Sequence, residues 1–328
     1  MEVISLEQSL LVARPEWLNT GEEFVVRTSP ADEEGYWVGA PGVYYDAESR
    51  TVYLYYRLRR PRGSGRGYEA RIAKSADGVT FHDVWRVTQE QLDSPSIERG
   101  ALTHHHGLWT LYLSYVNGDT HQWQIDRLVG DQVETLNVQA RCTELDTSMI
   151  GGHAVKDPLL VPMGPLSFLY VSYAPTDLVD LGDSLGDLHA SNDVFTTGRV
   201  HSHTGLAISV GGEPHNWVGE VLGSSPTGWD SLVSRISGLV KMGSLYLAFY
   251  DGAADVEENY EERVGLALTA DLKTFYKIPA EGPWIQSQYG SLRYVAPVHT
   301  EEGLILYYEA RTASGAHILC GRKLGGIA

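Results

Sequence analysis

Charged residues recur at one position of a repeated pattern in the chain. The pattern is an apolar and aromatic segment that ends in tyrosine, and in four copies a charged residue lies 15 to 17 residues before that tyrosine. These residues are Glu98, Asp157, Arg235 and Arg293. Two carboxylates and two guanidiniums that converge on one axis would shift one another's pKa values and could hold a polar ligand through paired hydrogen bonds.

The repeat itself predicts the elements that position these charges. Its five copies are residues 51–57, 108–115, 166–173, 244–250 and 304–310, and the tyrosines Tyr56, Tyr115, Tyr173, Tyr250 and Tyr308 mark them. The tyrosines are separated by 59, 58, 77 and 58 residues, which is the order of a four-stranded propeller blade with long loops. Alternating β-branched and aromatic residues indicate strands rather than helices.

A second extended segment precedes each copy and is joined to it by a turn. In three copies a third extended segment follows. We therefore predict an all-β fold: a five-bladed β-propeller with four-stranded antiparallel blades around a central funnel. The chain 1–328 would form one domain with blades at approximately 36–90, 91–145, 150–220, 228–280 and 285–328. Residues 1–35 would help to close the ring, through a strand near 23–29. The alternative, a two-domain β-sandwich protein, does not require five copies at this period.

The first strand of each blade lines the channel of a propeller, so the four charges should face a water-filled funnel. The equivalent position in blade one, Gly39-Ala40, carries no charge. Asp157 lies in GGHAVKDPLLV, where strand alternation would place His153 on the same face. The alternative is that such charges only form ion pairs that hold the blades together. For the whole set we favour a binding or catalytic site.

The candidate site extends beyond these four residues. We predict Asp157, Glu98 and Asp251 as catalytic carboxylates. The predicted substrate-binding residues are His153, Arg99, Arg235, Arg293, Tyr294, Asp230, Glu258 and Arg57. Aromatic residues such as Trp37 and Tyr260 could stack on sugar faces. The histidine triplet 104–106 adjoins the turn residue Gly107, where exposed polar groups are normal, and we predict no metal site and no cofactor.

Two loops are unusually long for the repeat. Segment 174–204 adds about twenty residues to blade three by the repeat arithmetic, and it is acidic first and histidine-bearing later. Segment 251–263 connects strands of blade four and carries Glu258 and Glu262. Long loops in compact domains are often functional lids, although they can also serve as subunit contacts.

Composition limits the classes of partner. The 328 residues include 42 acidic and 25 basic side chains, a net charge of −17 that disfavours nucleic acid and anionic lipid. No stretch is long and apolar enough to span a membrane, and the N-terminus lacks the pattern of a secretory signal. Cys142 and Cys320 have no metal or redox spacing, and two thiols in a chain of this length fit a reducing cytosol, with a single disulfide between them as the alternative. We expect a cytoplasmic protein, with a small sugar or other polar metabolite as its partner. The oligomeric state is not predicted.

Several of these motifs resemble those of known enzymes. Asp157-Pro158 on an inner strand before an apolar run, the Ser-x-Asp-Gly/Leu-x-x-aromatic repeat and the aromatic-Leu-Tyr strands resemble the five-bladed glycoside hydrolases of families 43, 32, 62 and 130. The chain looks most similar to bacterial glycosyl hydrolase-like propeller proteins. The resemblance covers nearly the whole chain as architecture and implies a carbohydrate substrate.

The resemblance carries over unevenly to individual residues. Asp157 matches the blade-three acid that orients and stabilises the transition state in families 43 and 32. The blade-one Asp-Pro of those families is Ala40-Pro41 here, and Ser234 and Arg235 occupy the expected place of the blade-four acid. Glu98 with Asp157 could form the required carboxylate pair, and Asp251, Asp230, Glu258 or Glu262 could supply an acid instead.

Three functions therefore remain open from the sequence. The first is a glycoside hydrolase-like enzyme that processes a small sugar-containing substrate by carboxylate acid/base chemistry. The second is a repurposed propeller that lacks glycosidase activity and binds or transforms another polar or anionic metabolite. Arg235 and Arg293 would suit an anion better than a neutral sugar. A propeller that serves only as a scaffold for protein partners is a third possibility.

Overall fold

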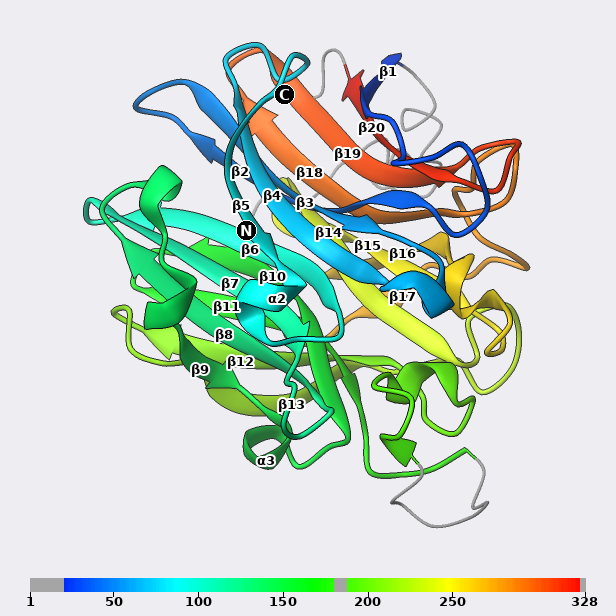
Figure 1. The fold of residues 1–328 in the computed structure, drawn as a ribbon. Coiled ribbons are helices and arrows are strands. Elements are labelled where there is room, and N and C mark those ends of the chain that lie inside the picture. The colour runs from blue at the N-terminus through cyan, green and yellow to red at the C-terminus, as the bar shows by residue number, and fades with distance from the viewer. Residues whose placement is uncertain (1–20, 180–187, 325–328) are drawn as a thin grey trace.

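The computed structural model describes residues 21–179 and 188–324. They form a five-bladed β-propeller whose blades are antiparallel sheets (Figure 1). Blade one contains β2 (Trp37–Asp46), β3 (Thr51–Arg59), β4 (Gly67–Ser75) and β5 (His82–Thr88), and blade two contains β6 (Ile97–His105), β7 (Leu108–Val116), β8 (Trp123–Gly130) and β9 (Cys142–Leu145). Blade three contains β10 (Ala154–Met163), β11 (Leu166–Ala174), β12 (His203–Val210) and β13 (Asn216–Leu222), and blade four contains β14 (Val233–Met242), β15 (Leu245–Ala253), β16 (Arg263–Thr269) and β17 (Tyr276–Lys277).

Blade five combines both ends of the described chain. It contains β18 (Leu292–Thr300), β19 (Gly303–Arg311) and β20 (His317–Leu324), and β1 (Glu22–Arg27) pairs antiparallel with β20 as the fourth strand (Figure 1). A single parallel bridge between Trp37 and His317 joins blade five to blade one. The ring is therefore held closed by hydrogen bonds between segments nearly 300 residues apart, which ties its stability to contacts of long sequence separation.

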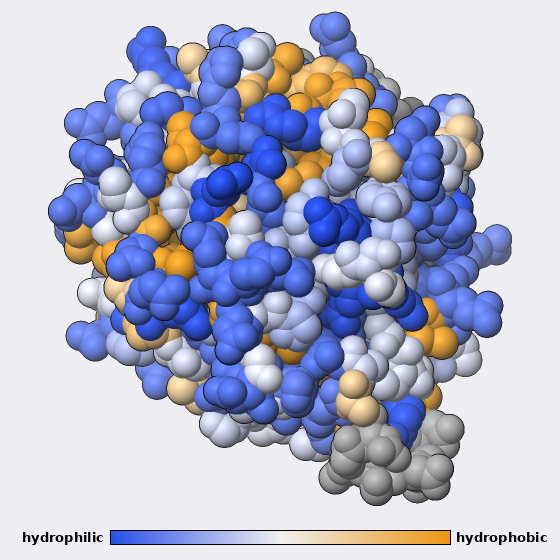
Figure 2. All heavy atoms as spheres, in the orientation of Figure 1, coloured by the Kyte–Doolittle hydropathy of each residue, from blue (hydrophilic) through white to orange (hydrophobic). Residues whose placement is uncertain are grey.

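Helical segments are short and lie in the connections. They are η2 (Arg62–Ser64), α2 (Gln89–Leu92), η3 (Val133–Thr135), η4 (Val138–Ala140), α3 (Thr147–Ile150), η5 (Val194–Thr196) and η6 (Glu258–Tyr260). None of the helices within residues 21–179 and 188–324 is long and apolar enough to cross a membrane. Both cysteines are free. The face in Figure 2 is largely hydrophilic, with hydrophobic groups in separate patches.

The apolar core lies between neighbouring blades rather than around the axis. Between blades one and two, for example, Tyr55, Ile72 and Trp85 pack in one buried cluster with Leu111 and Leu113. The aromatic residues of the repeated second strand thus fill the wedge-shaped space between sheets. This arrangement leaves the inner strands free to carry polar side chains toward the axis.

Every inner strand is interrupted by a bulge at the same depth. The register of pairing shifts by one residue between Gly39 and Gly42 in β2, and equivalent shifts occur in β6, β10, β14 and β18. At the bulges Ala40, Asp157 and Tyr294 adopt φ angles of 50°, 55° and 56°, a left-handed conformation that is uncommon for residues other than glycine. Bulges re-aim side chains and end regular alternation, so residue parity along these strands does not predict which side chains share a face.

Inner strands approach each other closely beyond the bulges. A Cβ atom at Gly42 would lie 2.0 Å from the carbonyl oxygen of Gly100 on the adjacent inner strand. At Gly238 it would lie 2.4 Å from Pro297 Cδ. Glycine at these positions therefore allows five strands to converge around one axis.

We predict that Gly42→Val lowers the free energy of unfolding by about 1–3 kcal/mol, because the added side chain overpacks the β2–β6 contact. Urea denaturation measures this change. Gly63→Val is the control, since a Cβ atom at Gly63 meets no atom within 4 Å. Equal stability of the two variants would contradict the role assigned to Gly42.

Candidate functional site

The four charged residues predicted to line the funnel come together at the centre of the propeller. Glu98, Asp157, Arg235 and Arg293 are each at most 3% exposed. They are buried rather than exposed to a water-filled funnel as predicted, and buried charges are costly unless they are paired. Their partners include charged groups from second strands and from one loop.

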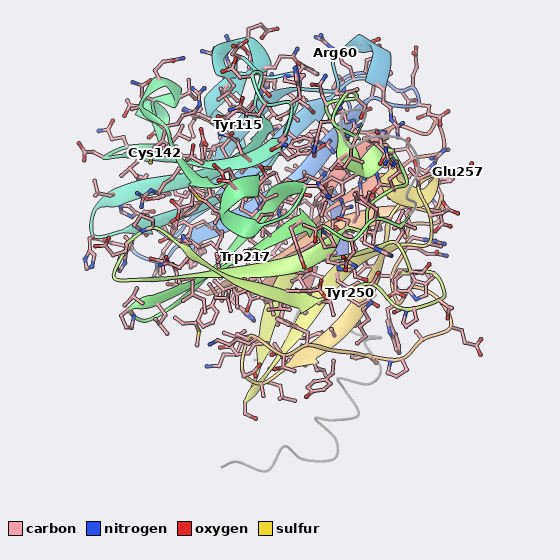
Figure 3. The ribbon with its side chains drawn as sticks, turned by 90° about the horizontal axis from the view of Figure 1, so that it is seen from below. Arg60, Tyr115, Cys142, Trp217, Tyr250 and Glu257 are labelled. Carbon is pink, nitrogen blue, oxygen red and sulfur yellow. The ribbon has the colours of Figure 1, made fainter. Side chains whose placement is uncertain are left out.

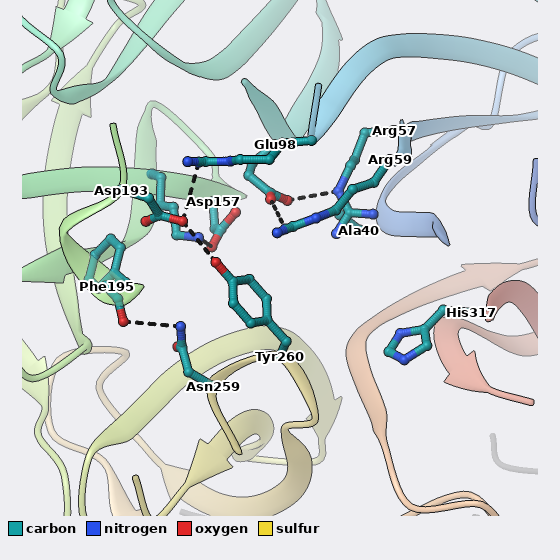
Figure 4. Close-up of polar contacts among 12 residues, drawn as sticks. Ala40, Arg57, Arg59, Glu98, Asp157, Asp193, Phe195, Asn259, Tyr260 and His317 are labelled. Carbon is teal, nitrogen blue, oxygen red and sulfur yellow. Dashed lines mark hydrogen bonds and ion pairs between the residues drawn. The ribbon is translucent and has the colours of Figure 1, made fainter. Parts of the chain in front are cut away.

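The first half of this arrangement joins blades one, two and five. Arg57 Nε donates to Glu98 Oε2 at 2.9 Å, and Arg59 Nη1 donates to Glu98 Oε1 at 3.1 Å (Figure 4). Arg57 Nη2 also lies 3.6 Å from Glu309 Oε2. Glu309 in turn accepts from Arg293, with Nη2 and Oε1 2.7 Å apart.

The second half joins blades five, four and three. Glu262 lies between two guanidiniums, pairing with Arg293 at 2.5 Å and with Arg235. Arg235 Nη1 is 3.9 Å from Asp157 Oδ2, and Lys156 Nζ is 3.6 Å from the same oxygen. We call these residues the charge ring: Arg59, Glu98, Arg57, Glu309, Arg293, Glu262, Arg235, Asp157 and Lys156. Cations and carboxylates alternate along it, and all five blades contribute.

Glu309 occupies the blade-one position that lacks an acid in the sequence. Its Oε2 accepts the backbone N–H of Ala40 at 3.0 Å, and a Cβ atom at Gly39 would lie only 2.1 Å from this oxygen. The missing side chain at Gly39 thus leaves room for a carboxylate from blade five. His317, which is fully buried, holds the other oxygen, with Nδ1 2.8 Å from Oε1.

Two carboxyl groups of the site have opposite electrostatic environments. Burial alone would raise the pKa of Glu98, but Arg57, Lys156 and Arg59 outweigh it and lower the pKa to about 2. Burial raises the pKa of Asp251 to about 7, opposed by Arg235 and reinforced by Glu262. Asp251 Oδ1 accepts the Tyr294 N–H at 2.9 Å, and Asp251 pairs in register with Arg235. At neutral pH one carboxyl is therefore ionised and the other is poised to carry a proton.

Asp157 differs from the other carboxylates of the charge ring because neither of its oxygens accepts a hydrogen bond. It is 3% exposed, and its cations lie at 3.6 and 3.9 Å rather than in hydrogen-bonding contact. The Nη1 and Nη2 atoms of Arg57 are likewise buried without a hydrogen bond. These atoms are the ones a polar ligand could satisfy, since buried polar groups are normally hydrogen-bonded.

Two long loops cover the channel on one side of the charge ring. Tyr260 Oη donates to Asp193 Oδ2 at 3.1 Å, and Asn259 Nδ2 donates to the Phe195 carbonyl oxygen at 3.1 Å (Figure 4). Arg66 also pairs with Asp193 at 3.2 Å. We call this set of contacts the cap. It joins the blade-three segment 174–204, of which residues 180–187 lie outside the described residues, to the blade-four segment 251–263.

A pocket of about 480 Å³ lies at the edge of the cap, and we call it the upper pocket. It is lined by Glu34, Gly35, Trp37, Arg59, Arg60, Pro61, Arg62, Glu257, Tyr260, Glu261 and Arg311. Figure 3 shows Arg60 at the top of the view and Glu257 at its right edge, and both line this pocket. The Trp37 ring packs 5.6 Å from that of Tyr260, and Arg293 Cζ lies 4.9 Å from the centre of the Trp37 ring. Trp37 therefore connects the upper pocket to the charge ring.

Other predicted site residues lie outside the charge ring. His153 Nε2 is 3.4 Å from the Thr176 carbonyl oxygen in the blade-three loop. Strand alternation does not place it beside Asp157, because β10 begins after His153 and bulges at Asp157. Asp230 accepts from Lys277 at 2.7 Å and from Tyr250, and Glu258 accepts from Arg263 at 2.6 Å. These two carboxylates hold strands and a loop of blade four.

Arg99 and Tyr294 lie on the axis but outside the ion pairs. Arg99 donates from Nε to the Pro41 carbonyl oxygen and from Nη2 to that of Ser237, both at 2.8 Å. It spans the channel from blade two to blades one and four. Tyr294 is 3% exposed, and its ring faces Arg235 and Arg293 at 5.9 and 5.3 Å.

Sequence reasoning missed Glu309, Arg59 and Asp193. Glu309 had a detectable signal, because it directly follows the repeat tyrosine Tyr308, as Asp251 follows Tyr250 and Arg57 follows Tyr56. Both of those equivalents were predicted to be site residues. Asp193 belongs to a loop that has no counterpart in the other copies of the repeat, so no pattern indicated it.

We predict that Arg293→Met lowers the free energy of unfolding by about 3–5 kcal/mol, because it leaves Glu309 and Glu262 as buried, partly unpaired anions. Urea denaturation tests this, with Arg50→Ala as the control. The Arg50–Glu301 pair is 73% and 55% exposed, and such pairs contribute less than about 1 kcal/mol. A loss in Arg293→Met no greater than that in Arg50→Ala would contradict a stabilising charge ring.

Comparison with known proteins shows similarity of structure without detectable similarity of sequence. No family model and no curated protein matches the sequence. An endo-arabinase from Bacteroides thetaiotaomicron superposes with a TM-score of 0.62 at 12% identity, covering 92% of this chain and 97% of that one. A thermostable family-43 glycoside hydrolase gives 0.62 at 11% identity, with 86% and 88% covered. A GH43_1 enzyme from Xanthomonas citri in complex with xylotriose gives 0.60 at 12% identity, with 95% and 92% covered.

These identities are low, and the similarity extends over most of each chain. It agrees with the resemblance seen in the inner-strand and repeat motifs. The protein has the five-bladed propeller fold of the family-43 glycoside hydrolases.

Proposed function

We propose that the protein is a glycoside hydrolase-like enzyme that cleaves a small sugar-containing substrate at the charge ring. The observation that carries this proposal is the pair of opposed carboxyl environments on one axis. Asp251, with a pKa of about 7, can donate a proton, while Glu98, with a pKa of about 2, remains an anion. Glycosidic cleavage requires one protonated and one ionised carboxyl group.

The roles follow from the contacts of each group. Asp251 is the general acid that protonates the leaving oxygen. Asp157 is the carboxylate that acts on the sugar or on water, because its oxygens accept no hydrogen bond within the protein. Glu98 stays ionised because Arg57 and Arg59 hold it, and it positions these two guanidiniums beside the site.

The aromatic side chains near the cap suit a sugar ring. Trp37 and Tyr260 line the upper pocket beside Arg59, which itself contacts Glu98. Aromatic faces pack against the apolar faces of sugars, and hydroxyl groups could satisfy Asp157. Since Tyr260 and Asp193 cover the charge ring, their contact must open for substrate to reach it.

The second candidate is a propeller that binds an anionic metabolite without hydrolysing a glycoside. The charge ring supports this candidate because it contains five cations and four carboxylates, which leaves one cation in excess. Arg57 also has two terminal nitrogens without hydrogen bonds. A guanidinium with free donors recognises carboxylate or phosphate groups well.

We predict that kcat/KM falls tenfold per pH unit above about pH 7, because the acid Asp251 must be protonated and its pKa is raised to about 7. Glu98, with a pKa near 2, would not limit the rate between pH 4 and 7. A pH–rate profile measures this dependence. The alkaline decline should disappear from the residual activity of Asp251→Asn, and its persistence there would assign the proton to another group.

We predict that Asp157→Asn lowers kcat by at least about 100-fold, because it replaces the carboxylate with an uncharged amide of the same shape. The measurement is hydrolysis of 4-nitrophenyl α-L-arabinofuranoside, β-D-xyloside and β-D-glucuronide, with Asp230→Asn as a control outside the charge ring. Full activity in Asp157→Asn would refute the proposed chemistry. Absence of turnover in the wild type, together with calorimetric binding of glucuronate, would instead favour the second candidate.

A further inference from the structure

A second pocket lies on the axis at the other end of the channel, along the C-terminal halves of the inner strands. We propose that this lower pocket binds a monocarboxylate with a small apolar body, through Arg99. The pocket has a volume of about 240 Å³. All five inner strands contribute to its wall, through Val43, Leu102, Leu160, Leu239 and Pro297 among others.

Arg99 is a buried cation without a carboxylate partner. It is 1% exposed, and its two hydrogen bonds go to the carbonyl oxygens of Pro41 and Ser237. Within residues 21–179 and 188–324 no carboxylate forms an ion pair with it, whereas Arg57, Arg235 and Arg293 each pair with two carboxylates. Carbonyl dipoles offset only part of a buried charge, and three of its five N–H donors remain for a ligand.

The lining of the lower pocket favours an anion. No aspartate or glutamate of the described chain lines it, and its nitrogen bases are Arg99, Lys241 and His299. This is unusual for a protein whose net charge is −17. Most of the remaining wall is aliphatic side chain and proline.

The chemistry of the pocket narrows the ligand further. A planar guanidinium binds a carboxylate through paired hydrogen bonds. An apolar wall does not solvate additional charge, so a monoanion with an apolar body fits better than phosphate. A cavity of about 150 Å³ can hold benzene. The larger lower pocket therefore has room for one six-membered ring and its carboxylate.

Calorimetric titration of the full protein tests this site with benzoate as the probe. We expect saturable binding of one benzoate per chain. Benzyl alcohol, which lacks the charge, and acetate, which lacks the ring, should each bind at least roughly tenfold more weakly. Equal affinity for benzyl alcohol would show that Arg99 does not recognise the carboxylate. Equal affinity for acetate would show that the pocket binds anions without recognising the ring.

Three variants, one of them a control, locate the binding. Leu239→Trp fills the lower pocket from a half-buried wall position and should weaken benzoate binding at least roughly tenfold. Val210→Trp, at a 59% exposed position at the end of β12, is the matched control and should bind normally. Arg99→Gln should also weaken binding, and Leu239→Trp keeps the test valid if this variant fails to fold. Unchanged binding in Leu239→Trp, or no binding by the wild type, would overturn the proposal. The proposal does not depend on glycoside cleavage, so the two can fail separately.

Discussion

The alternation of charge around the axis is the interaction on which the rest of the structure depends. Burial of four carboxylates and five cations would be prohibitive if any were isolated, and each has an oppositely charged neighbour, which for all but Lys156 comes from another strand or blade. The inner strands therefore do not need an apolar core at the axis. Their apolar contacts lie between blades, and the ion pairs fix how the blades meet.

The charge ring also determines what chemistry is available. Carboxylates held by two guanidiniums, such as Glu98 and Glu262, are committed to ion pairs. Asp251 lies just outside the ring and forms no ion pair within the described residues, so burial raises its pKa to about 7. Asp157 forms the longest ion pair of the ring, with Arg235, and its oxygens accept no hydrogen bond. Most charges of the ring form ion pairs between blades, whereas Asp157 and Asp251 are the groups that we propose for catalysis.

Much of the fold was predictable because five similar segments at similar spacing can be explained by few architectures. The positions of Glu98, Asp157, Arg235 and Arg293 followed from the same repeat, since equivalent positions meet at the axis. Glu309 was missed although it directly follows Tyr308, the place in the repeat that Arg57 and Asp251 occupy in their own copies. His153 was grouped with Asp157 by alternation, and the bulge that breaks this alternation leaves no clear trace in the residue types. The contacts of the cap are specific to individual loops, so a repeat could not predict them.

The most direct test of this account is the titration of the Asp251 carboxyl group, observed by carboxyl-carbon NMR and assigned by comparison with Asp251→Asn. The account predicts a midpoint near pH 7, produced by burial beside the charge ring. Titration near pH 4, the ordinary range of an aspartate, would show that Asp251 is ionised at neutral pH and cannot be the proposed acid.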